Sequence, residues 1–211
     1  MTHGDETNLE EAAGNGSTSS IRAFIALPLS EDAQRGASAL RDKLQAQFSD
    51  LRLRWVRPEN LHLTLRFLGQ LEPSKIAVLA RELKTSVASQ PAFSFRLTNP
   101  FVFPSPARPR VIALGLEPAE PVVRLAQAVE RAVRAANLPP EDRSFRPHIT
   151  LARFPKKAKL TNLTAELEIG EIHERASEIA LFRSVLHSTG PVYSVLERVA
   201  LDDALSEESS Q

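Results

Sequence analysis

The feature that most constrains this chain is a short pattern that occurs twice. His62-Leu63-Thr64-Leu65 is repeated in the second half of the chain as His148-Ile149-Thr150-Leu151. In both copies polar and aliphatic residues alternate, which is typical of a β-strand with one face in a core. On such a strand the histidine and the threonine share a face and lie about 7 Å apart along it. The pattern therefore predicts two strands, each offering one imidazole and one hydroxyl from a face whose back is buried.

The sequence before each copy indicates an internal duplication. Ile25-Ala26-Leu27 precedes the first copy, and Ile112-Ala113-Leu114 precedes the second at nearly the same distance. A stretch with helical periodicity lies between in both cases. Each half is therefore predicted to run strand, helix, His-x-Thr strand.

Hydrophobic periodicity and turn residues predict a mixed α and β body between residues 21 and 201. Helices are predicted at 31–48, with Ser30 as the N-cap, at 73–88 and at 121–136. Strands are predicted at 21–27, 53–56, 60–69, 93–97, 111–116, 147–154, 168–173, 177–186 and 191–201.

Four prolines between residues 99 and 110 predict a stiff loop rather than regular structure. The loop carries Phe101 and Phe103 together with two arginines, Arg108 and Arg110. Such a composition suits the wall of a groove, and it equally suits a loop that packs on the core.

The two ends of the chain are acidic. Residues 1–20 are rich in Gly, Ser and Thr and have no apolar run, so we predict a disordered tail and not a secretory signal. Residues 202–211 are predicted to form a second acidic tail. Because acidic and basic residues balance over the whole chain, the body between the tails carries a basic excess. That excess suits a polyanionic partner such as RNA, although many solvated surfaces carry one without a partner.

Composition excludes several classes of protein. No apolar run approaches the length of a membrane span. The chain has no cysteine, which excludes disulfides and thiolate metal sites and fits a cytoplasmic location.

Two imidazoles that face each other can act as base and acid across one scissile bond, since the ordinary pKa of histidine is about 6.5. The threonine hydroxyls can donate to an anion held between them. In-line displacement at phosphorus fits this set: one histidine activates water and the other protonates the leaving oxygen. No metal, cofactor or covalent intermediate is required.

Five stretches, two of which contain the motifs, carry a resemblance to a known family: 22–27, 54–65, 103–106, 146–153 and 190–193. With them the sequence resembles the two-histidine (2H) phosphoesterase superfamily. Within it, the chain resembles the bacterial and archaeal RNA 2′,3′-cyclic phosphodiesterases, formerly called 2′-5′ RNA ligases. The resemblance covers residues 21 to about 201.

The resemblance implies an α+β fold with two intertwined lobes related by a pseudo-twofold axis. Two antiparallel sheets would line a central groove, with helices packed outside. It also implies hydrolysis of RNA 2′,3′-cyclic phosphate ends to a 2′-phosphomonoester, and the reverse, ATP-independent 2′-5′ ligation. The implied partners are RNA with such an end, including tRNA fragments, or cyclic nucleotides, acted on by a monomer without a metal or a cofactor.

The resemblance also implies roles for individual residues. His62 is the proton donor to the 3′ oxygen, and His148 is the proton acceptor that activates water. The remaining implied substrate contacts are Thr64, Thr150 and Arg153 at the phosphate and Phe24 near the nucleobase.

One arginine follows each motif, and strict alternation places the two on opposite faces relative to their histidines. Strict alternation turns Arg153 away from His148, so its role requires a β-bulge or a strand end. Alternation places Arg66 on the His62 face, which makes it a further candidate phosphate contact, although the family does not require one there.

Two other functions fit the same residues. The chain could be a binding module that holds RNA or nucleotide phosphates without turnover, or a 2H phosphodiesterase for another cyclic or 2′-5′-linked nucleotide. Lys156, Lys157 and Lys159 form a basic loop that is either solvated or in contact with the RNA backbone.

Overall fold

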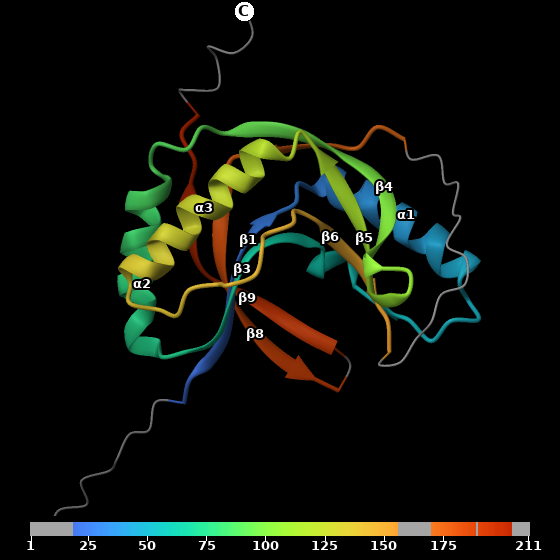
Figure 1. Ribbon diagram of the computed structural model, residues 1–211, viewed down its shortest axis with the longest axis horizontal. Coiled ribbons are helices and arrows are strands. Elements are labelled where there is room, and N and C mark those ends of the chain that lie inside the picture. The colour runs from blue at the N-terminus through green and yellow to red at the C-terminus, as the bar shows by residue number, and fades with distance from the viewer. Residues whose placement is uncertain (1–18, 156–169, 189, 204–211) are drawn as a thin grey trace, which may run out of the picture.

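The computed structural model describes residues 19–155, 170–188 and 190–203. Within these residues a curled antiparallel sheet carries three α-helices on its outer side (Figure 1). The helices are α1 (Glu31–Gln47), α2 (Pro73–Val87) and α3 (Glu120–Ala135). The strands are β1 (Ile21–Pro28), β2 (Arg54–Trp55), β3 (His62–Leu71), β4 (Phe93–Ser105), β5 (Arg108–Glu117), β6 (Ile149–Arg153), β7 (His173–Ala176), β8 (Glu178–His187) and β9 (Gly190–Ala200).

The sheet consists of two four-stranded halves that meet at its middle. Its order is β7-β4-β5-β6-β3-β1-β8-β9, and β2 pairs with β6 outside this path. The halves are joined where β3 meets β6, through the single residue pair Leu63 and Ile149. The predicted α+β class is confirmed. Instead of the two separate sheets that were predicted, the structure has one continuous sheet, and we call the place where β3 meets β6 its seam.

The helices cross between the halves. α1 follows β1 in the chain but contacts β6 and β7, whereas α3 follows β5 but contacts β3 and α2. Ser30 caps α1, as predicted, because its hydroxyl accepts a hydrogen bond from the Ala33 amide at 3.3 Å. Helical periodicity predicts an apolar stripe in α1 that includes Ala33, Ala37, Leu40 and Leu44, and all four are buried.

The back of each motif strand lies in the core, as alternation predicted. Leu61, Leu63 and Leu65 behind the first motif are buried, as are Ile149 and Leu151 behind the second. Full burial of one such side chain stabilises the fold by about 1.5–3 kcal/mol. This burial fixes which face of β3 and β6 presents the imidazoles and hydroxyls.

Both motif strands contain a β-bulge at the third residue after the histidine. In β3, Ala26 lies opposite Thr64 and Ile25 lies opposite Arg66, so Leu65 is the extra residue. In β6, Ala113 lies opposite Thr150 and Ile112 opposite Ala152, so Leu151 is the extra residue. A bulge reverses the alternation beyond it. The fifth residue after each histidine, Phe67 or Arg153, therefore faces the same way as that histidine.

The prediction of a stiff loop at residues 99–110 is wrong. β4 and β5 pair as a hairpin through this stretch, with Pro100 opposite Leu114 and Pro104 opposite Pro109. Among the described residues β7 pairs with β4 only at Phe93 to Arg96, so beyond that point no described strand covers this side of β4. Proline is tolerated on an edge and beside the register shifts found here, because no ladder amide is required.

Two boundaries also differ from the prediction. The strand predicted at 168–173 is β7, which begins only at His173, while residues 168 and 169 lie outside the described residues. Asp202 belongs to the body and not to a tail, because its carbonyl accepts a hydrogen bond from Ala92 and its amide donates to Gln90. Residues 1–18, the lysines at 156, 157 and 159, and residues 204–211 lie outside the described part of the chain. No helix among the described residues is long and apolar enough to cross a membrane.

Candidate active site

The two motifs lie side by side at the seam of the sheet. Because β3 and β6 are antiparallel and Leu63 faces Ile149, one step in either direction places His62 beside Thr150 and Thr64 beside His148. We call the side bearing these four residues the His-x-Thr face. The α-carbons of His62 and His148 are diagonal neighbours, about 7–8 Å apart. A pseudo-twofold axis passes through the Leu63–Ile149 pair.

The ring of His62 is held by two hydrogen bonds. Its Nδ1 lies 2.8 Å from the Asn60 carbonyl oxygen, and its Nε2 lies 2.9 Å from the Thr64 hydroxyl. A carbonyl only accepts, so Nδ1 carries a proton and the Nε2 of the neutral ring accepts from Thr64. Asn60 is buried and its side-chain amide donates to the Pro191 carbonyl on β9 at 2.9 Å.

His148 repeats this arrangement. Its Nδ1 donates to the carbonyl oxygen of Arg146 at 2.8 Å, again two residues before the histidine. The imidazole stacks on Phe103, with 5.6 Å between ring centres, and the Arg146 guanidinium lies 5.8 Å from the same phenyl ring. Both histidines are thus fixed in the tautomer that leaves Nε2 for chemistry.

Aromatic rings surround His62. Phe24 stacks on it at 4.8 Å and Tyr193 meets it edge-on at 5.5 Å, while Phe182, which stacks on Phe24 at 5.1 Å, lies 6.4 Å from the His62 ring. This burial lowers the pKa of His62 to about 4. The hydrogen bond to Asn60 opposes the shift, and the positive charges of Arg153 and His148 add to it. At pH 7 the His62 ring is neutral.

Arg153 lies on the His-x-Thr face. Its charge acts on His62 and also on Tyr193, where burial raises the pKa of the phenol against the opposing charges of Arg153 and Arg22. Arg54 on β2 lies opposite Arg153. Within the described residues, none of these three arginines has a carboxylate partner. The face therefore carries positive charge that an anion can neutralise.

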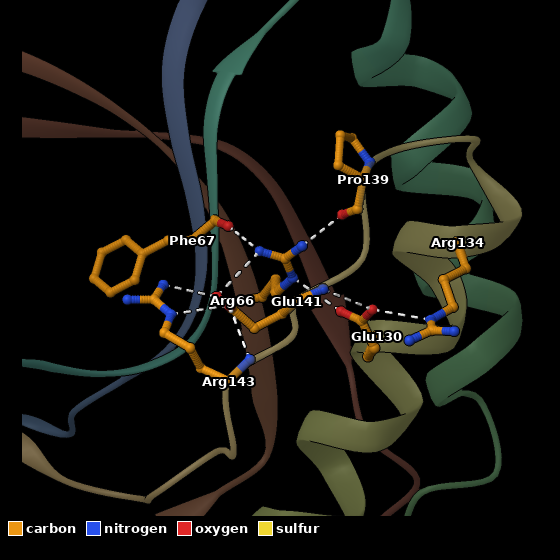
Figure 2. A network of polar contacts seen from close by, with 7 residues as sticks. All are labelled: Arg66, Phe67, Glu130, Arg134, Pro139, Glu141 and Arg143. Carbon is orange, nitrogen blue, oxygen red and sulfur yellow. Dashed lines mark hydrogen bonds and ion pairs between the residues drawn. The ribbon is translucent and has the colours of Figure 1, made fainter.

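Arg66 is not on this face, so its prediction as a phosphate contact is wrong. The bulge at Leu65 turns it to the helix side, where Nε donates to the Glu130 carboxylate at 2.9 Å (Figure 2). Its other nitrogens donate to the backbone carbonyls of Phe67 and Pro139. Each of the three guanidinium nitrogens therefore already has an acceptor there.

Phe24 lies against His62, but it is only 3% exposed. Phe67, its cross-strand partner on β3, is 46% exposed and presents the open aromatic surface on this part of the sheet. The sequence did not identify Asn60, Phe182 or Tyr193 as site residues, and it singled out Phe103 only as part of a loop that suits a groove wall. Three of them lie in stretches that carry the family resemblance, yet only the long-range strand pairing shows which histidine each one contacts.

The site thus brings together two imidazoles, two hydroxyls and the guanidinium of Arg153, which has no carboxylate partner among the described residues. These groups can transfer protons and can bind a phosphate. No cluster of three or more His, Asp or Glu side chains that could hold a metal ion occurs within the described ranges.

Comparison with known proteins gives the same picture. The family described as "LigT like Phosphoesterase" matches residues 27–113 and again residues 114–193, once for each half of the chain. The RNA 2′,3′-cyclic phosphodiesterase of Methanothermobacter thermautotrophicus is 32% identical over 84% of this chain and 97% of its own length. The enzyme of the same name from Thermotoga maritima is 30% identical over 88% of this chain and 98% of its own length.

Solved structures agree with the fold. TT0787 of Thermus thermophilus superimposes with a TM-score of 0.73 at 30% identity, over 87% of this chain and 99% of that one. E. coli LigT in its apo form superimposes with a TM-score of 0.71 at 26% identity, over 88% of this chain and 99% of that one. The family match in both halves and these relatives lead to one conclusion: the chain belongs to the LigT-like phosphoesterase family.

Proposed function

We propose that this protein hydrolyses 2′,3′-cyclic phosphate ends of RNA to 2′-phosphomonoesters by acid–base catalysis with His62 and His148. The observation that carries the proposal is the pairing of the two motifs across Leu63 and Ile149, beside Arg153, whose charge acts on His62. The names of its relatives from M. thermautotrophicus and T. maritima support the substrate class. The E. coli LigT structures with 3′-AMP and with phosphate support a nucleotide phosphate as ligand.

In the proposed reaction the phosphorus lies between the two imidazoles. Thr64, Thr150 and Arg153 donate to its non-bridging oxygens. The Nε2 of His148 takes a proton from water, whose oxygen bonds to phosphorus opposite the 3′ oxygen. The bond from phosphorus to the 3′ oxygen breaks, and protonated His62 gives its Nε2 proton to that oxygen. The products are a 2′-phosphate and a 3′ hydroxyl.

His62 must be protonated to act as the acid, although its ring is neutral in the free site. An anionic phosphate beside it favours the charged ring and raises its pKa. Once Nε2 carries a proton it no longer accepts from Thr64, so the Thr64 hydroxyl becomes free to donate to the phosphate. Substrate binding and charging of the acid therefore support each other.

The nucleobase would lie along the aromatic part of the face. Phe24 contributes to this wall mainly by covering His62, and the exposed ring of Phe67 offers a surface on which a base can stack. With a 5′ hydroxyl in place of water, the same proton transfers would form a 2′-5′ linkage without ATP.

A panel of substrates tests the proposal. We expect turnover of 2′,3′-cyclic mononucleotides and of an oligoribonucleotide with a 2′,3′-cyclic end, each giving the 2′-phosphate, with chelator present. Turnover confined to 2′-5′ oligoadenylate or to ADP-ribose cyclic phosphate would assign another substrate. Tight binding without any product would make the chain a binding module and reject the proposal.

A further inference from the structure

The placement of one catalytic histidine relative to the other requires more than the sheet. β3 and β6 share only the Leu63–Ile149 pair. The connection that leads from α3 to β6 ends at His148, and no residue from Leu138 to His148 belongs to a helix, a strand or a hydrogen-bonded turn. The backbone ladder alone therefore holds this connection weakly against β3.

Arg66 supplies a second attachment between β3 and this connection. It follows His62 by four residues, and its side chain is only 11% exposed. Its Nη2 donates to the Pro139 carbonyl at 2.6 Å, and its Nη1 lies 3.7 Å from the Glu141 carboxylate. Its Nε donates to Glu130 on α3 at 2.9 Å. Figure 2 shows the guanidinium between these three groups.

The two acidic residues join the connection to α3 as well. The Glu130 carboxylate accepts from Arg134 at 3.0 Å and from the Glu141 amide at 3.2 Å. Glu141 in turn pairs with Arg143 at 2.8 Å. Because Arg66 and Glu130 are largely shielded from water, the charge-assisted bond between them is stronger than that of a surface ion pair.

The connection before His62 is held differently. Gln34 and Arg41 on α1 donate to the carbonyls of Pro58 and Val56, at 2.8 and 2.9 Å. Those two side-chain bonds stay within the first half of the chain, while the backbone of this connection reaches β6, since the Val56 amide donates to the Leu151 carbonyl at 2.8 Å. Arg66 instead reaches from the strand of the first histidine to the segment that delivers the second.

We propose that Arg66 is a positioning residue that sets the distance and orientation of His148 relative to His62. It touches no reacting atom. Its effect on turnover rests on the proposed function, but its effect on the placement of His148 does not.

The kinetic test uses Arg66→Met. Glu130 and Glu141 keep Arg134 and Arg143 as partners, so the variant is left without a buried unpaired charge. A misplacement of about 1 Å can cost about 100-fold in rate. We therefore expect kcat on 2′,3′-cyclic AMP to fall about 10- to 100-fold, with KM changed less than about threefold. The kcat of Arg66→Lys should lie between those of the parent protein and Arg66→Met, since one ammonium cannot reach all these acceptors at once.

The matched control is Arg96→Met, which removes an arginine paired with Glu117 on the exposed surface of β4 and β5. Its kcat should stay within about twofold of the parent protein. Unfolding curves of each variant give the folded fraction at the assay temperature. An Arg66→Met variant with the parent kcat, or a loss that only follows the unfolded fraction, would overturn the proposal.

A second readout does not depend on activity. In NMR spectra of the imidazole protons, Arg66→Met should shift the His148 signals and change their response to added 2′-AMP, whereas Arg96→Met should not. Unchanged His148 signals would overturn the proposal even if the parent protein proves inactive. Absence of turnover by the parent protein would instead reject only the proposed function. If Arg66→Met does not fold, Arg66→Lys and Glu130→Gln carry both measurements.

Discussion

At the scale of a residue, the environment of His62 explains how one imidazole can differ from its pseudo-symmetric partner. Both rings donate from Nδ1 to a carbonyl two residues earlier. Only His62 is enclosed by Phe24, Phe182 and Tyr193 as well. An aromatic enclosure disfavours the charged ring, whereas an anion beside it favours that ring. In the proposed reaction, the arrival of the phosphate would therefore charge His62.

NMR titration of His62 measures this directly. We expect a pKa of about 4 in the free protein, and a higher value with 2′-AMP bound. Phe24→Ala should raise the pKa of free His62 toward 6.5, because water then reaches the ring. Phe101→Ala, at an exposed phenylalanine of the other half, is the control and should leave it unchanged. A His62 pKa near 6.5 in the parent protein would contradict the account.

The same shift makes the free energy of unfolding depend on pH. Between about pH 4 and 6.5 unfolded His62 binds a proton and folded His62 does not, so stability rises with pH in this window. The contribution is complete above about pH 6.5 and is lost toward pH 4, and it amounts to about 3 kcal/mol at most. In urea unfolding at pH 4, 5, 6 and 7, His62→Gln should show a flatter dependence than the parent protein. Equal slopes would show that His62 is not shielded.

At the scale of an element, the bulge at the third position after each histidine decides which side chains reach the site. It brings Arg153 onto the His-x-Thr face and puts Phe67 at the equivalent place in the other half. It also sends Arg66 to α3. One irregularity, repeated in both strands, thus separates the proposed phosphate contact, Arg153, from the proposed positioning residue, Arg66.

Arg153 should therefore matter for binding a phosphate. We expect Arg153→Gln to weaken the binding of 2′-AMP about tenfold, which corresponds to about 1.4 kcal/mol. Arg108→Gln, at an exposed arginine near the turn of the β4–β5 hairpin, should change it less than twofold. Isothermal titration calorimetry gives both values, and equal affinities in the two variants would place Arg153 outside the phosphate site.

The sequence predicted elements where local pattern determines structure. The apolar stripe of α1 and the alternation of the two motifs follow from periodicity, so their buried residues could be named in advance. A bulge has no such local pattern, since Leu65 and Leu151 resemble ordinary core residues. The prolines of β4 were misleading because their tolerance depends on β7 stopping at Phe93 to Arg96, a long-range pairing.

At the scale of the whole molecule, the duplication could be predicted from the spacing of the motifs, but the way in which its halves join could not. The seam is one pair, Leu63 and Ile149, and both are fully buried. Helices that cross to the other half's strands reinforce it. The aromatic neighbours of each histidine likewise come from segments far away in the chain.

Leu63→Ala tests the seam. Loss of a fully buried leucine costs about 2–5 kcal/mol. At this position it should also lower kcat/KM of the folded protein about tenfold, because both motifs lose their common support. Leu83→Ala removes an equally buried leucine from α2 and should cost similar stability while leaving the activity of the folded fraction unchanged. Unfolding curves and initial rates, measured below both transitions, separate the two effects.

The central claim is that two histidines from distant parts of the chain flank one phosphorus atom. The most direct test measures hydrolysis of an RNA with a 2′,3′-cyclic end by the parent protein, His62→Ala and His148→Ala, in chelator and with the product identified. The account predicts a 2′-phosphate from the parent protein and a loss of at least about 100-fold in each variant. Near-parent activity in either variant, or activity abolished by chelator and restored by zinc, would contradict it.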